Sequence, residues 1–275
     1  MLRFLSLLWI FILVVPAVAQ DRRPSTCFAI ADATPGIEYL QKAGFHDPVA
    51  PFGVRISYLD HSQFLLQTPG GLSVVTDYNG FIGSADFIPD VVTMNHAHRS
   101  HWTPVPDPAI ANALRGWPDA TGPADHYLDL GEMLVRNVTT DIRSPFDAGI
   151  EKDGNSIFVF EAEGLCIGHL GHLHHEPTEA QYAALGRLDV VMAAVDGGLT
   201  VDLPTMIRII KRLRSSIVLP MHWFNDVSLE RFLAGVGDEF DITRAGETSL
   251  RVSLDNLPSR PTVIVLRPRF LRATE

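Results

Sequence analysis

The sequence predicts an α+β fold in which two β-sheets pack together and helices cover their outer faces. From about residue 54 to residue 168, the chain is a succession of short apolar or alternating runs separated by turn residues, which is typical of a meander of strands. From residue 178 onward, apolar runs of strand length alternate with helical segments. Sheets that bury one face against each other and the opposite face under helices satisfy both patterns.

The expected strands are short runs rich in β-branched and apolar residues, bounded by residues that favour turns. In chain order they cover residues 54–59, 64–68, 72–76, 90–94, 133–138, 156–160, 165–168, 188–194, 216–219, 248–254 and 261–266. Pro69-Gly70-Gly71 separates two of them, and a hairpin is expected to turn near Glu163-Gly164. The polar, glycine-containing segment 147–155 is expected to be a loop.

Helices are expected where apolar residues recur at helical spacing behind a capping residue. Thr178 is a suitable N-cap for a helix that ends near Leu185. Inside the long connection 102–131, Asp107 is a suitable N-cap for a shorter helix. In chain order, the expected helices cover residues 37–43 (one or two turns), 108–114, 178–185, 203–213 and about 229–234.

The first residues of the chain are predicted to be a secretory signal peptide. Arg3 precedes the apolar run 4–15, and Ala17-Val18-Ala19 fits a small-x-small cleavage site before Gln20. The run is short for a membrane span, and no second apolar run follows it, although an uncleaved N-terminal anchor is the alternative. The predicted organisation is a signal peptide (1–19), an N-terminal arm (20–52) and one domain (53–275).

Charge and cysteine content narrow the functional classes. The chain of 275 residues carries 22 basic and 32 acidic residues, and an acidic exported protein is a poor candidate for binding nucleic acid or anionic lipid. We therefore expect a periplasmic or secreted protein with no stable membrane anchor after processing and with a small-molecule substrate; its oligomeric state is left open. Cys27 lies in the arm and Cys166 in an apolar run, and two such distant cysteines carry little pairing information. The sequence therefore leaves open whether the two cysteines form a disulfide.

The most informative stretch is Asn95-His-Ala-His-Arg-Ser-His101, which follows the predicted strand 90–94. Side chains alternate across a strand, so His96 and His98 point the same way where the strand ends. His101 can return to the same point after a turn. Neutral imidazole is the commonest protein ligand for a metal ion, so this cluster indicates a metal site.

Other predicted strands end in residues that suit the same chemistry. Strand 72–76 ends in Asp77, strand 165–168 leads to His169 and His172, and strand 216–219 leads to His222. A single histidine at a strand end is usually structural and hydrogen-bonded. Several strands that present such groups at their carboxyl ends predict a metal site in a shallow cleft, because those ends can lie side by side in a sheet.

These motifs resemble those of the metallo-β-lactamase superfamily, and within it the branch of lactonase-like and general metal-dependent hydrolases. The resemblance runs from about Val54 to the end of the chain. It rests on the segments Ile56-Ser-Tyr-Leu-Asp-His-Ser-Gln-Phe-Leu65, Val75-Thr-Asp-Tyr78, His96-Ala-His-Arg-Ser-His101, Gly164-Leu-Cys-Ile-Gly-His-Leu-Gly-His-Leu173 and Pro220-Met-His222. The resemblance implies a four-layer αββα sandwich with a one- or two-metal site, usually of zinc.

The chain departs from the family pattern at three positions. Ser100 stands where the family has an aspartate that binds a second metal, and His172 stands where the family has a metal-bridging aspartate. No histidine corresponds to the family's third motif, where Asp141 is at best a weak substitute. Imidazole has one available lone pair and cannot bridge two dications, so we expect one metal ion per chain. Zinc is favoured, and iron, copper and nickel suit the same ligand set.

The predicted metal ligands are His96, His98, His101, His172 and His222. Asp77 is expected to orient a ligand histidine, as carboxylates behind metal ligands do. Ser100 is expected to hold a water molecule, His61 to lie on the floor of the site or in the core, and His169 to support the site or contact the substrate. The candidates for a catalytic base are His172, His174 and His175, the histidines closest in sequence to the site.

The resulting hypothesis is an exported metal-dependent hydrolase that activates water on an ester, a lactone or a related substrate. The substrate class follows from the resemblance alone. Two alternatives remain. One is a non-catalytic periplasmic metal-binding protein, which the loss of carboxylates and the gain of histidines would suit. The other is a mononuclear iron oxidoreductase of the same fold.

Overall fold

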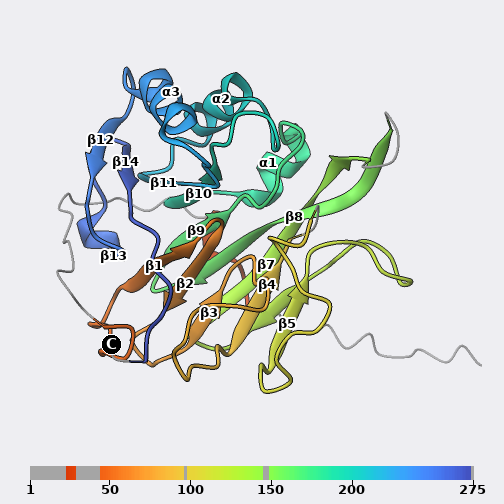
Figure 1. Ribbon diagram of the computed structural model, residues 1–275, viewed down its shortest axis with the longest axis vertical. Helices are drawn as coiled ribbons and strands as arrows, with labels where there is room; N and C mark the ends of the chain where they lie inside the picture. The colour runs from red at the N-terminus through yellow and green to blue at the C-terminus, as the bar shows by residue number, and fades with distance from the viewer. Residues whose placement is uncertain (1–22, 29–43, 96–97, 145–148, 274–275) are drawn as a thin grey trace, which may run out of the picture.

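The computed structural model describes residues 23–28, 44–95, 98–144 and 149–273. Within them, two β-sheets pack against each other and the α-helices lie together on one outer side (Figure 1). The α+β sandwich expected from the sequence is thereby confirmed. The predicted signal peptide and the turns predicted over 37–43 lie outside the described residues. No helix in the described part of the chain is long and apolar enough to cross a membrane.

The first sheet has six strands in the order β13-β1-β2-β3-β4-β5. These strands are β1 Val54–Asp60, β2 Gln63–Gln67, β3 Ser73–Val75, β4 Val91–Met94, β5 Asn112–Arg115 and β13 Ser249–Val252. The second sheet has eight strands in the order β12-β14-β11-β10-β9-β8-β7-β6. They are β6 Tyr127–Asp129, β7 Met133–Arg143, β8 Ile150–Ala162, β9 Leu165–His169, β10 Val190–Ala194, β11 Ile217–Met221, β12 Asp241–Arg244 and β14 Thr262–Val265.

Each of the three α-helices begins behind a capping residue, and the cap at Thr178 was predicted from the sequence. The helices are α1 Glu179–Leu185, α2 Leu203–Leu213 and α3 Asp226–Val236, with 3-10 turns η1 Thr26–Phe28 and η2 Leu254–Asn256. Thr178 caps α1 in a capping box with Gln181. Asp202 caps α2, and Asn225 caps α3. Each cap accepts a backbone N–H group that the first helical turn leaves without an intrahelical partner.

Three apolar clusters hold the layers together. Between the sheets, Ile56 and Phe64 pack with Phe158 and Met192. Between the eight-stranded sheet and its helices lie residues such as Val191, Val218, Met206, Ile209 and Phe232. On the outer face of the six-stranded sheet, Val75 and Val92 pack in the described residues under loop segments that include Tyr78, Ile82 and Leu271. In the part of the chain that is described, loops form the fourth layer that the resemblance assigns to helices.

The predicted helix over residues 108–114 is wrong. Residues 112–115 form β5, which pairs in parallel with β4, with Asn112 opposite Val91. Asp107 instead closes a turn, in which its carboxylate accepts the N–H of Ala109. The alanine-rich sequence has local helix propensity, but ladder hydrogen bonds to a strand that is distant in the sequence decide its conformation.

The predicted loop over residues 147–155 is also wrong from residue 150 onward. β8 begins at Ile150 and pairs with an extension of β7, with Glu151 opposite Ile142 and Asn155 opposite Thr140. Figure 1 shows this β7–β8 ribbon extending past the rest of its sheet. Polar residues are tolerated there because the end of the ribbon does not face the core. Sequence patterning missed β6 and β12 because both are short and only partly buried or exposed.

The two cysteines, whose pairing the sequence left open, are joined in the structure. Cys27 and Cys166 form a disulfide, with their Cα atoms 5.7 Å apart. Hydrogen bonds to the neighbouring strand β8 hold the arm beside Cys166 of β9. Glu161 of β8 accepts them from the Ser25 hydroxyl and the Thr26 backbone N–H. These contacts join residues more than 130 positions apart, so cysteine spacing carries no sign of them.

Candidate metal centre

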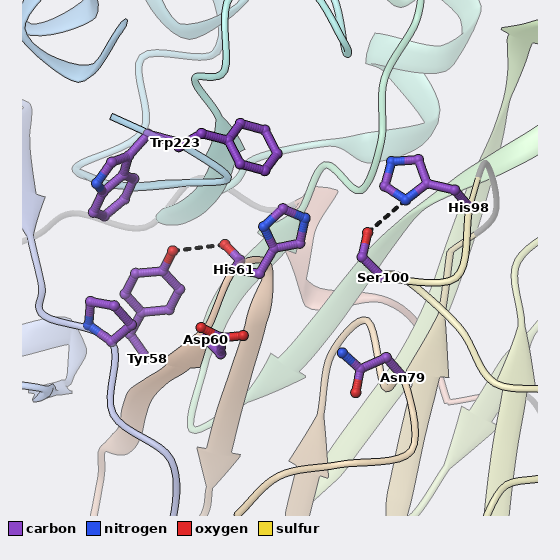
Figure 2. Close-up of a pocket in the computed structure, with 9 residues that line it drawn as sticks. Tyr58, Asp60, His61, Asn79, His98, Ser100 and Trp223 are labelled. Carbon is purple, nitrogen blue, oxygen red and sulfur yellow. Dashed lines mark hydrogen bonds between the residues drawn. The ribbon is translucent and has the colours of Figure 1, made fainter. Parts of the chain in front are cut away.

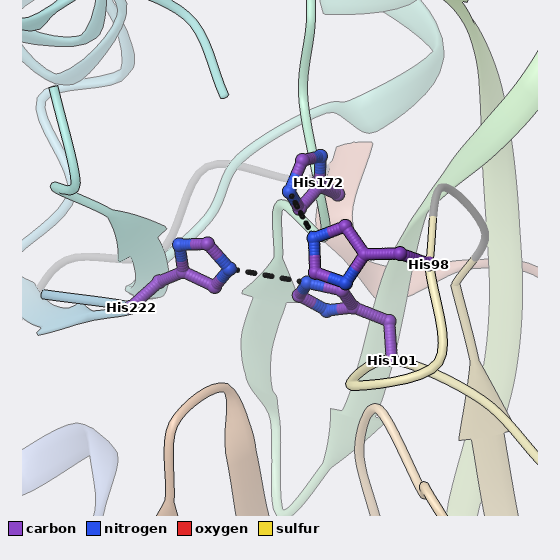
Figure 3. Close-up of side chains that lie close together, drawn as sticks. All are labelled: His98, His101, His172 and His222. Carbon is purple, nitrogen blue, oxygen red and sulfur yellow. Dashed lines mark hydrogen bonds between the residues drawn. The ribbon is translucent and has the colours of Figure 1, made fainter. Parts of the chain in front are cut away.

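Four histidine rings meet at one edge of the sandwich (Figure 3). His98 and His101 lie in the loop after β4, His172 follows β9 and His222 follows β11. One ring nitrogen from each residue lies within 4.8 Å of the others. These four were predicted as metal ligands from the sequence, and the structure brings them together. The fifth predicted ligand, His96, lies outside the described residues.

Parallel strand pairing produces this convergence. In the eight-stranded sheet, β10 is parallel to both β9 and β11, and in the six-stranded sheet β4 is parallel to β3. The carboxyl ends of parallel neighbours meet at the same edge of a sheet. His172, His222 and Asp77 therefore reach one region although they are far apart in the sequence.

His101 is fully buried and held from behind by Asp77. Its Nδ1 lies 2.5 Å from Asp77 Oδ2 and 3.1 Å from the Ser62 hydroxyl. Burial, followed by the neighbouring His222, holds the pKa of His101 well below its usual range. Burial also raises the pKa of Asp77, against hydrogen bonds from Ser62 and from the backbone N–H of Asn95. Asp77 thus contacts the ring that the sequence analysis expected it to orient.

His222 is held in the same way by Asp196, which the sequence analysis did not single out. Its Nδ1 lies 2.9 Å from Asp196 Oδ2. Burial opposes ionisation of Asp196, but hydrogen bonds from His222, Thr200 and Gly198 hold its pKa far below the ordinary value. Asp196 follows β10, the strand between β9 and β11. The signal was therefore present, because Asp196 stands just past a strand end like the other site residues.

The front nitrogens of His101 and His222 face each other, with their Nε2 atoms 3.1 Å apart. When each ring donates its Nδ1–H to a carboxylate, each Nε2 carries a lone pair and no proton. Two lone pairs at this distance repel each other unless a proton or a metal ion lies between them. Two nitrogens bound to one tetrahedral zinc at about 2.0–2.1 Å lie about 3.3 Å apart. The donor set therefore fits a metal ion.

His98 and His172 complete the cluster as a second facing pair. Their Nε2 atoms are 3.1 Å apart. The Ser100 hydroxyl lies 2.6 Å from His98 Nδ1, so Ser100 contacts one ring of the cluster directly. His172 Nδ1 lies 2.8 Å from His174 Nε2. Each ring of the cluster thus has a hydrogen-bond partner at its far nitrogen.

His169 and His61, which were also predicted to belong to the site, lie next to the cluster. His169 is buried between backbone groups, with Nε2 2.8 Å from the carbonyl of Ser62 and Nδ1 accepting the N–H of Gly171. The ring of His61 lies tilted against the ring of His222, with 4.0 Å between the ring centroids. The Nε2 atom of His61 is buried without a hydrogen-bond partner among the described atoms. Burial and His222 lower the pKa of His61 to about 4.

His175 and Asp141 lie away from the four rings. His175 lines a separate pocket of about 290 Å³ together with Arg143 and Arg208. Asp141 bonds to Lys152 on the β7–β8 ribbon, with Nζ 2.6 Å from Oδ2. Asp141 therefore does not substitute for the histidine of the family's third motif, because its carboxylate is already engaged on the ribbon.

A pocket of about 350 Å³ opens beside the cluster (Figure 2). Aromatic side chains of Tyr58, Trp223 and Phe224 form part of its wall, and His61, His98 and Ser100 form the part next to the metal centre. The remaining lining residues are Asp60, Asn79 and Pro268. Among the described residues that line it there is no lysine or arginine, and Asp60 is the one acid among them.

Comparison with known proteins assigns the fold to a family. The sequence model described as "Beta-lactamase superfamily domain" matches residues 55–222, which include the described cluster residues from His98 to His222. The chain belongs to the beta-lactamase superfamily. No curated protein matches the chain.

Solved structures agree with this family. A Thermotoga maritima protein assigned as a Zn-dependent hydrolase of the metallo-beta-lactamase superfamily is 24% identical, with a TM-score of 0.55 over 78% of this chain and 98% of its own. A Parabacteroides distasonis protein assigned as a metal-dependent hydrolase is 13% identical, with a TM-score of 0.51 over 67% of this chain and 89% of its own. At these identities the similarity concerns the fold. The match to the family model confirms the resemblance to the superfamily that the sequence motifs indicated.

Proposed function

We propose that this chain is a metal-dependent hydrolase whose metal ion is held by the histidine cluster. The observation that carries the proposal is the pair His101 and His222, whose Nε2 atoms face each other at 3.1 Å while their Nδ1 atoms lie against Asp77 and Asp196. A buried carboxylate behind each ring fixes the tautomer that leaves the front lone pair free for a metal. Family membership supports the hydrolytic chemistry.

The metal would supply a water-derived nucleophile near neutral pH and would polarise the substrate's carbonyl oxygen. The protein contributes the rest. Asp77 and Asp196 hold two rings in place, and the Ser100 hydroxyl holds a third. His101, His172 and His222 are buried, so bulk water does not surround their rings. Zinc is the leading candidate for this neutral nitrogen set, and iron, copper and nickel are the others.

The pocket beside the cluster supports an uncharged ester or lactone as the substrate. Tyr58, Trp223 and Phe224 offer aromatic surface to an apolar group. A phosphoryl or carboxylate substrate would need a cationic partner, and the described residues that line the pocket include no lysine or arginine. Asp60 would repel an anion. We therefore propose neutral aryl esters and lactones as the substrates to test first.

One metal ion per chain is proposed rather than two. Ser100 and His172 replace the two aspartates that the superfamily pattern would supply to a second metal. Two dications at roughly 3.5–4 Å need an anionic bridge, which an imidazole does not provide. Elemental analysis after dialysis against a mild chelator should give one equivalent, and two tightly held equivalents would contradict the proposal.

The decisive experiment for the function compares the zinc-loaded protein with a variant of the cluster. We expect the loaded protein to hydrolyse phenyl acetate or a neutral lactone, to lose this activity with a chelator and to regain it with zinc. His101→Ala should lose both metal and activity. His46→Gln is the matched control, because His46 is an exposed histidine whose ring lies against Phe45 and outside the cluster. A loaded, folded protein that hydrolyses none of these substrates would contradict the proposal.

The two alternatives have their own readouts in the same preparation. Tight metal binding without turnover would favour a non-catalytic metal-binding protein, which the histidine-rich ligand set also suits. Iron in the isolated protein together with oxygen consumption would favour a mononuclear iron oxidoreductase. We expect neither outcome, because a pocket with aromatic side chains opens next to the cluster and can hold a substrate there.

We also propose that the protein is exported to the periplasm or secreted, with residues 1–19 removed. The disulfide between Cys27 and Cys166 supports this, because disulfides persist mainly in oxidising compartments. N-terminal sequencing of exported protein should begin near Gln20. A membrane-bound product that retains residues 1–19 would contradict the proposal.

A further inference from the structure

His172 differs from the other rings of the cluster in what lies behind it. His101 and His222 have carboxylates at their Nδ1 atoms, and carboxylates accept hydrogen bonds. His172 Nδ1 instead lies 2.8 Å from His174 Nε2. His174 Nδ1 in turn lies 2.8 Å from the backbone nitrogen of Arg143. The proton positions along this chain of contacts decide what His172 offers to the metal centre.

The backbone N–H of Arg143 determines which nitrogen of His174 carries a proton. A backbone N–H only donates, so His174 Nδ1 is an acceptor and carries no proton. The single proton of His174 is therefore on Nε2, and this N–H donates to His172 Nδ1. His172 Nδ1 is then an acceptor as well, which leaves the proton of His172 on Nε2. A doubly protonated His172 does not fit, because His174 would then have to accept at both nitrogens.

The four rings thus divide into three acceptors and one donor. His101 and His222 turn lone pairs inward, as their Nδ1 protons go to Asp77 and Asp196. His98 Nε2 accepts from His172 Nε2–H at 3.1 Å, so the proton of His98 is on Nδ1 and faces the Ser100 hydroxyl. His172 alone turns an N–H group into the cluster.

We propose that His172 is a hydrogen-bond donor to the substrate oxygen and not a metal ligand. The assignment rests on the proposed function for the presence of a metal. If His98, His101 and His222 give their lone pairs to a metal, the Nε2–H of His172 loses His98 as its acceptor. It then lies within 4.8 Å of the three ligand nitrogens with its proton available to an oxygen atom. An N–H donor placed there stabilises negative charge as it develops on a carbonyl oxygen during hydrolysis.

If His172 bound a metal through Nε2, the hydrogen bonds that run from Arg143 through His174 to His172 would have to break. The proton of His172 would have to move to Nδ1, where it would face the N–H of His174. His174 could accept this proton only by losing the hydrogen bond from the Arg143 backbone. His174 is therefore a positioning residue, since it sets which nitrogen of His172 carries the proton.

The tautomer can be read directly by long-range ¹H–¹⁵N correlation spectra of histidine-labelled protein, with and without zinc. We expect His172 to be protonated at Nε2 in both states and His101 and His222 to be protonated at Nδ1. His172 protonated at Nδ1 in the zinc-loaded protein would overturn the assignment. If the protein takes up no zinc, the proposed function fails. The spectrum of the metal-free protein still tests the hydrogen bonds from Arg143 through His174 to His172, and a proton on Nδ1 of His172 would contradict them.

Two matched variants separate a donor from a ligand. His172→Gln keeps an N–H donor, and His172→Leu removes it. Both are expected to retain one metal equivalent and the visible spectrum of the cobalt-substituted protein, while kcat falls by about 10²-fold or more in His172→Leu and less in His172→Gln. His98→Gln should instead lose the metal. Loss of metal from both His172 variants to the same extent as from His98→Gln would overturn the proposal.

Discussion

At the scale of single residues, the cluster is defined by the group behind each ring. Asp77, Asp196, Ser100 and His174 each contact the Nδ1 atom of one histidine. A ring held at its far nitrogen cannot rotate freely, and its tautomer follows from whether the partner accepts or donates. Rings of identical chemistry therefore acquire different roles.

The first prediction concerns Asp196, which holds His222. Asp196→Asn should lower zinc affinity by about 10- to 100-fold, because the neutral amide no longer stabilises the Nδ1–H tautomer of His222. Competition titration with a chromophoric chelator measures this. Asp226→Asn, at an exposed aspartate in the first turn of α3, is the control. Equal zinc affinity of both variants would contradict the role assigned to Asp196.

At the scale of secondary structure elements, the turn after β9 places His172. Gly171 has φ +62 there, and a Cβ atom would lie 1.8 Å from Asn95 Nδ2 and 2.6 Å from Asn155 Oδ1. Asn155 Oδ1 also accepts the backbone N–H of His172. The absence of a side chain at Gly171 thus lets the two asparagines approach this turn.

The second prediction follows from that contact. Gly171→Ala should destabilise the protein by about 1–3 kcal/mol, because it combines strain at positive φ with a clash against buried side chains. Chemical unfolding monitored by circular dichroism measures the change. Gly198→Ala is the matched control, since a Cβ atom there meets nothing within 4 Å. A loss of stability in the control equal to that of Gly171→Ala would refute the argument.

The third prediction concerns the buried ion pair between β7 and β8. Burial tends to raise the pKa of Glu161, but hydrogen bonds from Arg136, Ser25 and Thr26 outweigh it and lower the pKa below its ordinary value of 4.5. The folded state therefore favours the carboxylate. The resulting stabilisation is present above pH 4.5 and is lost as the pH falls through the lower folded-state pKa.

Glu161→Gln should flatten this acid-side loss of stability. Unfolding midpoints measured from pH 7 down to pH 3 would show a smaller decline for the variant than for the parent chain. Glu163→Gln, at a partly exposed residue in the turn between β8 and β9, is the control and should decline like the parent. A parallel decline of parent and Glu161→Gln would show that Glu161 does not contribute to the acid sensitivity.

At the scale of the whole molecule, the described residues of the N-terminal arm are fastened to the eight-stranded sheet by a disulfide and hydrogen bonds. The disulfide joins Cys27 to Cys166, which are 139 positions apart. Tyr127 donates its hydroxyl to the carbonyl of Arg23, and Arg187 donates its backbone N–H to the carbonyl of Cys27. The described arm residues are therefore part of the folded domain rather than a free extension.

The fourth prediction is that reduction of this disulfide lowers stability by about 2–5 kcal/mol while the metal centre stays intact. Thermal unfolding with and without a reductant measures the effect, and zinc content is determined in parallel. The Cys27→Ala, Cys166→Ala double variant should resemble the reduced protein and should not respond to the reductant. An unchanged melting temperature after complete reduction would contradict the prediction.

The sequence by itself determined the class of the fold and the location of the metal centre. Hydrophobic periodicity and turn residues are local signals, and they identified most strands and the capped helices. The cluster of His98, His101, His172 and His222 was predictable because each residue follows an apolar strand, and strand ends meet in a sheet. The same reasoning could have included Asp196.

Tertiary structure decided everything that depends on a partner distant in the chain. β5 is a strand because β4 lies beside it, and Cys27 is paired because Glu161 binds the arm. The position of the proton on His172 depends, through His174, on the backbone N–H of Arg143. No sequence pattern associates that N–H with His174, which lies 31 positions away. A hydrogen bond depends on atoms meeting in space, so the spacing of residues identifies the rings, and only their packing assigns a donor or an acceptor to each nitrogen.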